Sequence, residues 1–188
     1  GSKLGSTGAF SLTIKSLDLG EIPVTTVEAM DGTGNTFKPN MTTLALTYAN
    51  AFSDKARFGI SVKAITESIP RASASAFALD AGVQYENLND IEGLGIGLVL
   101  KNIGTDMHYE GSGLTTTASD DENLEDFYNI ESSYDKLPST FDMAMSYKVS
   151  DATLALTYTS HNFRYDDLSL GGEYELMDMV YLRGGMSI

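Results

Sequence analysis

Apolar and polar residues alternate with a period of two along most of this chain. In the segment 41–52, MTTLALTYANAF, large apolar residues such as Leu44, Leu46 and Tyr48 alternate with small or mildly polar ones. Because successive side chains of a β-strand point to opposite faces, this alternation predicts a strand with one apolar face. The same pattern returns in the segments 10–15, 57–64, 77–85, 93–101, 141–148, 153–159, 168–174 and 180–187. The pattern predicts an all-β protein of about nine strands, since no stretch keeps a helical period over several turns.

The second face of these strands indicates which kind of all-β protein this is. A soluble sandwich presents its outer face to water and is rich there in Lys, Glu, Arg and Gln. Here the second face is mostly Gly, Ala, Ser and Thr with scattered charges, while the apolar face is almost free of charge. Lipid contact requires such a face, because a lysine there at the membrane midplane costs about 2–4 kcal/mol. We therefore expect an antiparallel transmembrane β-barrel of the outer-membrane type, located in the bacterial outer membrane and in contact with its lipid.

Tyrosines on the apolar face recur at one end of the predicted strands. Each of the four precedes a short polar turn by a few residues: Tyr48, Tyr85, Tyr147 and Tyr174. Aromatic side chains gather at the two membrane–water interfaces of outer-membrane barrels. Strands favour tyrosine in any case, but that preference alone would place it at both ends. The four tyrosines predict an aromatic girdle near the short turns.

The predicted connections alternate in length. Short turns are expected at 53–56, 87–92, 150–151 and 177–179, and longer connections at 18–40, 67–73, 104–138 and 160–167. Outer-membrane barrels have short periplasmic turns and longer external loops, so the segments 18–40 and 104–138 are predicted to be long external loops. The second contains the acidic stretch 119–126, where we expect a solvated loop with a short helical turn at 123–129.

Composition and charge exclude several classes of function. Twenty-six acidic and twelve basic residues give a formal net charge of −14, which would repel a phosphate backbone, so no nucleic-acid partner is expected. The chain has no cysteine, which excludes disulfides, thiol catalysis and cysteine-ligated metals. His108 and His161 have no second ligand at a suitable spacing. We expect no enzyme activity, no catalytic residues, no metal and no cofactor.

Charged residues on the second face are candidates for lining a barrel lumen. They carry both signs: Lys15, Lys63, Asp80, Lys101, Asp142, Lys148, Glu173 and Arg183. Such residues either line an open lumen or form cross-strand ion pairs that fill it, and the mixture of signs favours ion pairs.

Several segments resemble a known family in their order along the chain. They are SLTIKSLDLGEIPVTT (11–26), DGTGNTF (31–37), LALTYANAFSDKARFGISVKAI (44–65), AFALDAGVQYE (76–86), GLGIGLVLKNIG (93–104), MHYEGSGL (107–114), LPSTFDMAMSY (137–147) and LGGEYELMDMVYLRGGMSI (170–188). This order resembles the PorV/PorQ-type family of outer-membrane proteins, which are distant relatives of FadL-like barrels. The resemblance implies a single barrel domain over residues 1–188 that is incomplete at both ends, since family members are longer and bacterial single-chain barrels have an even number of strands.

The resemblance also implies a function. Members of the family act in type IX secretion, receiving exported cargo proteins and passing them to other components, so secretion-system proteins or exported cargo domains are the expected partners. FadL relatives instead pass hydrophobic small molecules, which is the alternative function. A soluble β-sandwich adhesin or carbohydrate-binding module is a second alternative, although the chain has no tryptophan for stacking on sugars.

Overall fold

The computed structural model describes residues 2–3, 8–119, 125–177 and 179–188. In this part of the chain the only helical elements are the 3₁₀ turns η2 (Leu88–Asp90) and η3 (Ser112–Leu114), and no helix is long and apolar enough to cross a membrane. Nine long strands lie in one sheet: β2 (Ala9–Asp18), β5 (Asn40–Ala51), β6 (Ala56–Ile69), β7 (Ala72–Glu86), β8 (Leu94–Gly104), β13 (Thr140–Val149), β14 (Ala152–His161), β15 (Asp167–Met177) and β16 (Val180–Ser187). The all-β prediction is confirmed, and these strands cover the nine predicted segments.

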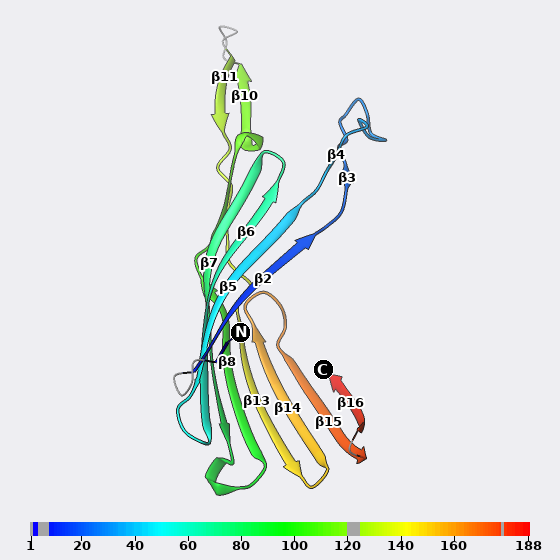
Figure 1. Ribbon diagram of the computed structural model, residues 1–188. Coiled ribbons are helices and arrows are strands. Elements are labelled where there is room, and N and C mark those ends of the chain that lie inside the picture. Colours follow the sequence, from blue (N-terminus) through cyan, green and yellow to red (C-terminus); the bar gives the residue numbers. More distant parts are fainter. Residues whose placement is uncertain (1, 4–7, 120–124, 178) are drawn as a thin grey trace.

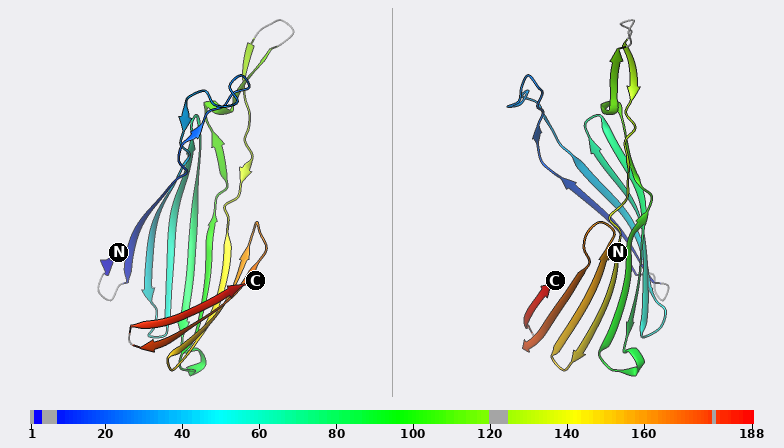
Figure 2. Two further views of the ribbon diagram at one scale, coloured as in Figure 1. Left: turned by 90° about the vertical axis from the view of Figure 1, so that its right-hand side faces the viewer. Right: turned by 180° about the vertical axis from the view of Figure 1, so that it is seen from behind.

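Each long strand pairs antiparallel with the next one along the chain, and the sheet curves strongly without closing on itself (Figures 1 and 2). One edge is formed by β2 with the short strand β1 (Ser2–Lys3), and the other edge is β16. Because an odd number of antiparallel strands separates the edges, β2 and β16 run in the same direction. Direct pairing of these two strands would therefore be parallel rather than antiparallel.

The two long connections lie at the same end of the sheet as the short β6–β7 turn, and the turns β5–β6, β7–β8 and β13–β14 lie at the opposite end (Figure 1). The connection between β2 and β5 carries the hairpin of β3 (Ile22–Pro23) and β4 (Thr36–Phe37). The connection between β8 and β13 carries four short strands: β9 (Met107–Glu110), β10 (Thr115–Ser119), β11 (Glu125–Asn129) and β12 (Tyr134–Asp135). The side of the membrane on which these connections lie remains a prediction.

Two details of the predicted connections are wrong. The long connection expected at 67–73 is a tight turn, because β6 continues to Ile69 and β7 begins at Ala72. The helical turn expected at 123–129 is strand β11 over residues 125–129, since pairing with β10 satisfies its backbone groups. Residues 120–124 of the acidic stretch, and residue 178 of the fourth short turn, lie outside the described residues.

The two faces of the sheet differ in burial. We call the face that carries Leu46, Val62 and Leu154 the apolar face and the opposite one the polar face; these three residues are 54%, 51% and 64% exposed. Nothing in the described part of the chain packs over the apolar face as a second sheet, which contradicts the β-sandwich alternative. Exposed apolar surface of this extent is unfavourable in water, and contact of this face with lipid remains the prediction.

Candidate functional site

A cross-strand ion pair lies at the centre of the polar face. Lys63 on β6 and Asp80 on β7 place Nζ and Oδ1 2.6 Å apart, and their side chains are only 14% and 26% exposed. The sheet register sets Lys63 opposite Ala78 and thus diagonal to Asp80, a separation that a long lysine side chain spans. Because both side chains are largely shielded from water, each charge is stabilised mainly by the other.

A β-bulge in β8 adds two side chains to this pair. The register between β7 and β8 shifts between Leu79 and Ala81, and Asn102 adopts a left-handed backbone with φ of 57°. Lys101 and Asn102 therefore both oppose Asp80. The amide N–H of Asn102 donates to Asp80 Oδ1 over 2.8 Å, and Lys63 donates to the side-chain oxygen of Asn102.

A second ion pair lies next to the bulge. Lys101 contacts Asp142 of β13 with an Nζ–Oδ2 distance of 2.5 Å, and Asp142 accepts a hydrogen bond from Thr159 of β14. We call Lys63, Asp80, Lys101, Asn102 and Asp142 the charged belt. It crosses four adjacent strands and places paired charges where small neighbouring residues leave room for them.

A further polar group lies at the junction of β14 and β15, close to the charged belt. His161 Nε2 lies 3.0 Å from Asp167 Oδ2, and Arg164 pairs with the same carboxylate. Asp166 accepts hydrogen bonds from the hydroxyl of Tyr158 at 2.6 Å and from the amide of His161 at 3.1 Å. These two contacts, the Tyr158 hydroxyl first, lower the pKa of Asp166 in the connecting loop. Ion pairs and hydrogen bonds to Asp166 and Asp167 thus stabilise the loop between β14 and β15.

The structure places all eight sequence-predicted lumen candidates on the polar face by their register. Lys63 with Asp80, Lys101 with Asp142 and Arg183 with Glu173 form ion pairs. For Lys15 and Lys148 no ion pair is present among the described residues. Whether these side chains line a lumen remains a prediction.

Sequence reasoning missed other interactions on the polar face. Asn102 was not among the candidates because it is uncharged. Asparagine adopts a left-handed backbone more readily than most residues, so an asparagine within a strand could have indicated a bulge. The ion pair between Arg57 and Glu86 was also missed, since the two residues lie 29 positions apart in sequence.

A small apolar cluster lies on the polar face beside the charged belt. Its buried members are 2–7% exposed, and partly buried Ile65 and Tyr109 pack against them: Ala74, Ala76, Ala78, Met107 and Leu137. Asn102 and Asn162 donate to the carbonyls of Pro138 and Leu137, both over 2.8 Å, so the segment carrying Leu137 is held against the sheet. The polar face thus combines fixed charges with a patch of hydrocarbon.

The Tyr109 hydroxyl closes one end of the apolar cluster by donating to Glu67. Tyr109 of β9 and Glu67 of β6 lie on either side of Ala74 in β7. Ala74 lies nearer the start of β7 than Phe77, the first large apolar side chain on the apolar face of that strand. The hydrogen bond to the carboxylate raises the pKa of Tyr109 to about 12, so the hydroxyl stays protonated and keeps its role as donor.

The four predicted girdle tyrosines lie on the apolar face near the short turns. Tyr85, Tyr147 and Tyr174 are 37%, 41% and 48% exposed. Tyr48 belongs to an aromatic group with Phe10 and Phe58, with ring centroids 4.8 and 6.0 Å away. Their position at a membrane interface stays a prediction.

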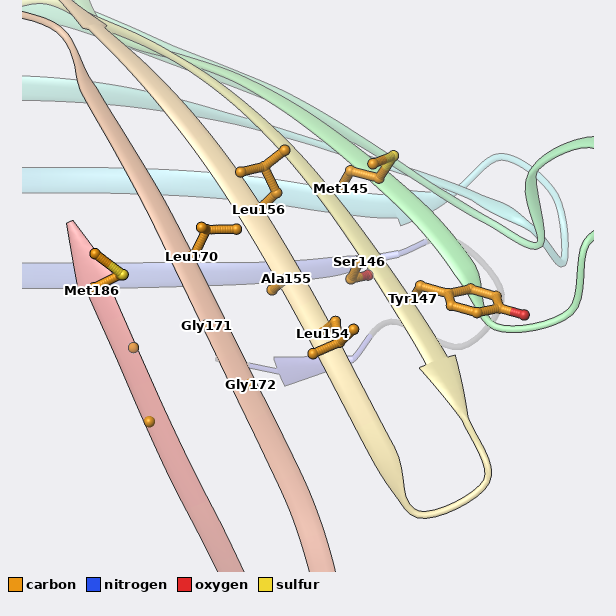
Figure 3. A pocket seen from close by; sticks show the side chains of 12 residues that line it. Met145, Ser146, Tyr147, Leu154, Ala155, Leu156, Leu170, Gly171, Gly172 and Met186 are labelled. Carbon is orange, nitrogen blue, oxygen red and sulfur yellow. The ribbon is translucent and has the colours of Figure 1, made fainter. Parts of the chain in front are cut away.

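A shallow hollow of about 660 Å³ lies on the sheet where β13 to β16 meet (Figure 3). Gly172 pairs with Gly184, and Gly171 pairs with Gly185, so these positions carry no side chains on either face. Larger side chains surround them: Met145, Tyr147, Leu154, Leu156, Leu170 and Met186.

Among the described residues, no group of three or more His, Asp or Glu side chains is arranged to hold a metal ion.

Comparison with known proteins identifies a similar fold. The solved structure of the deltaS2S3 mutant of TodX, a monoaromatic hydrocarbon channel, matches with a TM-score of 0.55 and 13% sequence identity, over 95% of this chain and 62% of that one. This chain therefore spans less than two thirds of the channel's length. No family model and no curated protein matches the chain. The predicted fold class is confirmed: the chain forms an antiparallel sheet of the outer-membrane β-barrel type, which is not closed in this structure.

Proposed function

We propose that this chain forms part of the wall of a bacterial outer-membrane barrel that takes up hydrophobic small molecules, as FadL-like channels do. The observation that carries the proposal is the apolar cluster on the polar face, next to the charged belt. A barrel wall needs apolar side chains only toward lipid. Because the buried side chains of the apolar cluster are only 2–7% exposed, an apolar solute reaches this hydrocarbon by displacing the segment that carries Leu137.

The rest of the sheet supports a location in the outer membrane. Strands of 8–15 residues with an apolar face almost free of charge match the span of a tilted membrane strand of about 9–11 residues. The fold of the TodX channel, whose printed description names monoaromatic hydrocarbons, supports the same class of solute. The role in type IX secretion predicted from the PorV/PorQ resemblance has no supporting observation of this kind. No catalytic role is proposed.

Binding of radiolabelled toluene to the detergent-solubilised chain tests the proposal. We expect saturable retention in equilibrium dialysis, with no retention of labelled glucose. Leu137→Ala removes a buried side chain from the apolar cluster, and we expect it to change the dissociation constant several-fold. Leu168→Ala is the matched control, because the same side chain is removed from the apolar face, where Leu168 is 40% exposed. Retention that is not saturable, or equal for both variants, would show that toluene only partitions into detergent.

A further inference from the structure

The segment 136–139 lies against the polar face without joining the sheet. Strand β12 ends at Asp135 and β13 begins at Thr140, so the segment has no strand partner. Pro138 has no N–H to donate to a neighbouring strand, and it restricts Leu137 before it to an extended backbone. The Leu137 side chain is only 6% exposed because it packs in the apolar cluster. We call residues 136–139 the strap.

Two asparagines hold the strap against the sheet, one in the β8 bulge and one directly after β14. Asn102 Nδ2 donates to the carbonyl of Pro138 and Asn162 Nδ2 to that of Leu137, both over 2.8 Å. The backbone amide of Asn162 donates to the carbonyl of Ser139 over 3.3 Å. Within the described residues the backbone of the strap makes no other hydrogen bond. Its polar attachment therefore comes from two residues alone.

The charged belt determines which way the Asn102 carboxamide points. Lys63 donates to the carboxamide oxygen, and a lysine ammonium group can only donate. The oxygen must therefore face Lys63, and the NH₂ group is directed to Pro138. The backbone of Asn102 is itself held by the bond from its amide N–H to Asp80. This asparagine is thus a fixed part of the sheet, whereas the strap that it holds belongs to no strand.

The buried side chains next to Leu137 are small or flexible. Ala74, Ala76 and Ala78 of β7 are 2–3% exposed, and Met107 of β9 is 7% exposed. When Leu137 leaves this cluster, the surface that becomes exposed is therefore hydrocarbon. Such a surface is unfavourable in water, and an apolar solute that takes the place of Leu137 removes that cost.

We propose that the strap opens in a minor population of molecules without any solute, and that Asn102 and Asn162 are the latches that set this population. A solute that binds only the open form shifts the equilibrium toward it. Its apparent affinity is reduced by the small open fraction, so weaker latches should give tighter apparent binding. As a gate for solute uptake the strap rests on the proposed function, whereas its opening can be measured without solute.

Cysteine labelling of the detergent-solubilised full chain measures the opening, since the chain has no cysteine of its own. Ala76→Cys places a single thiol in the apolar cluster beside Leu137. N-ethylmaleimide should label it at least about 100-fold more slowly than Val27→Cys, because a buried thiol reacts only while the structure is locally open. Val27 is 87% exposed and provides the rate of a freely accessible position.

Removing a latch should speed this labelling. In the Ala76→Cys chain, Asn162→Ala and Asn102→Asp should each raise the rate at least about threefold, the effect of losing one hydrogen bond. Asn102→Asp keeps a residue type that tolerates a left-handed backbone, but a carboxylate oxygen replaces the donating NH₂ group. Asn50→Asp is the matched control, because it removes a donor to the Tyr48 hydroxyl at 3.2 Å in β5 and should leave the rate unchanged.

Urea distinguishes opening of the strap from unfolding of the whole sheet. Strap opening exposes little surface, so the labelling rate should barely change with urea below the unfolding transition. A rate that rises steeply with urea there, equal rates for Ala76→Cys and Val27→Cys, or a rate that neither latch variant changes would overturn the proposal. If the latch variants speed labelling but the chain retains no toluene, the opening is confirmed and the proposed uptake of hydrophobic molecules is wrong.

Discussion

Asp80 Oδ1 accepts two contacts at once, from the amide N–H of Asn102 at 2.8 Å and from the Nζ of Lys63 at 2.6 Å. One carboxylate oxygen thus holds both the β-bulge in β8 and the neighbouring lysine of β6. Lys101, the residue before the bulge, forms an ion pair with Asp142 of β13. Loss of the Asp80 carboxylate should therefore affect three strands together.

Asp80→Asn should lower the free energy of unfolding by about 1–3 kcal/mol, since it leaves the largely buried Lys63 without its counter-charge. The measurement is urea unfolding of the chain in lipid vesicles, followed by tyrosine fluorescence. Glu21→Gln is the control, because the Glu21–Lys38 pair at 3.2 Å is 58% and 57% exposed and should contribute less than about 1 kcal/mol. Equal effects of the two variants would contradict a special role for the Lys63–Asp80 pair.

Lys63→Met combined with Asp80→Leu should recover most of the stability lost in Asp80→Asn. A buried ion pair replaced by apolar side chains of similar size is often neutral in free energy, because the desolvation cost disappears with the charges. The same unfolding measurement applies. A double variant less stable than Asp80→Asn would mean that the hydrogen bond to the Asn102 amide, and not the charge, holds the bulge.

Lysine substitutions on the apolar face distinguish a membrane strand from a soluble one. Met145 lies at the middle of β13 and Val149 at its end, and the two are 48% and 54% exposed. In a bilayer Met145→Lys should cost about 2–4 kcal/mol and Val149→Lys about 0–1 kcal/mol, because the cost depends on depth. Unfolding in lipid vesicles gives both values. In water, similar exposure predicts similar costs, so equal values would argue against the outer membrane.

Gly93→Ala tests the short turn between β7 and β8. Gly93 has φ of +81°, and an added Cβ would overlap the carbonyl of Lys148. We expect a loss well above about 1 kcal/mol, since strain and a steric clash add. Gly34→Ala is the matched control, with φ of +84° and no atom within 4 Å of an added Cβ, and should show only the backbone strain. Thermal unfolding of both variants separates the two contributions.

Asp166 should contribute a pH-dependent stabilisation of the β14–β15 loop. Its pKa is lower in the folded chain than in the unfolded one, chiefly through the Tyr158 hydroxyl and the His161 amide. The contribution is therefore complete above the unfolded pKa of about 4, and is lost as the pH falls through the lowered folded value. Amide exchange of residues 161–166 between pH 3 and pH 6 measures it. In Asp166→Asn this part of the pH dependence should disappear, and its persistence would assign it to Asp167.

The sequence determined the strands, since a period of two is a local property that side-chain chemistry displays residue by residue. It also determined which face of each strand is apolar, and the charges at Lys63, Asp80, Lys101 and Asp142 could be assigned to the opposite face without coordinates. A two-residue turn at 70–71 and strand β11 could not be predicted, because both depend on pairing between segments and not on local propensity.

Only the tertiary structure decided which charges meet. The bulge at Asn102 brings its own amide to Asp80 and its side chain to Lys63, and such a register shift leaves no periodic signal in the sequence. The same holds for the stacking of His108 on Tyr134, because the paired strands β9 and β12 come from different parts of the connection between β8 and β13. The sheet as a whole follows from local alternation, whereas these sites follow from long-range register.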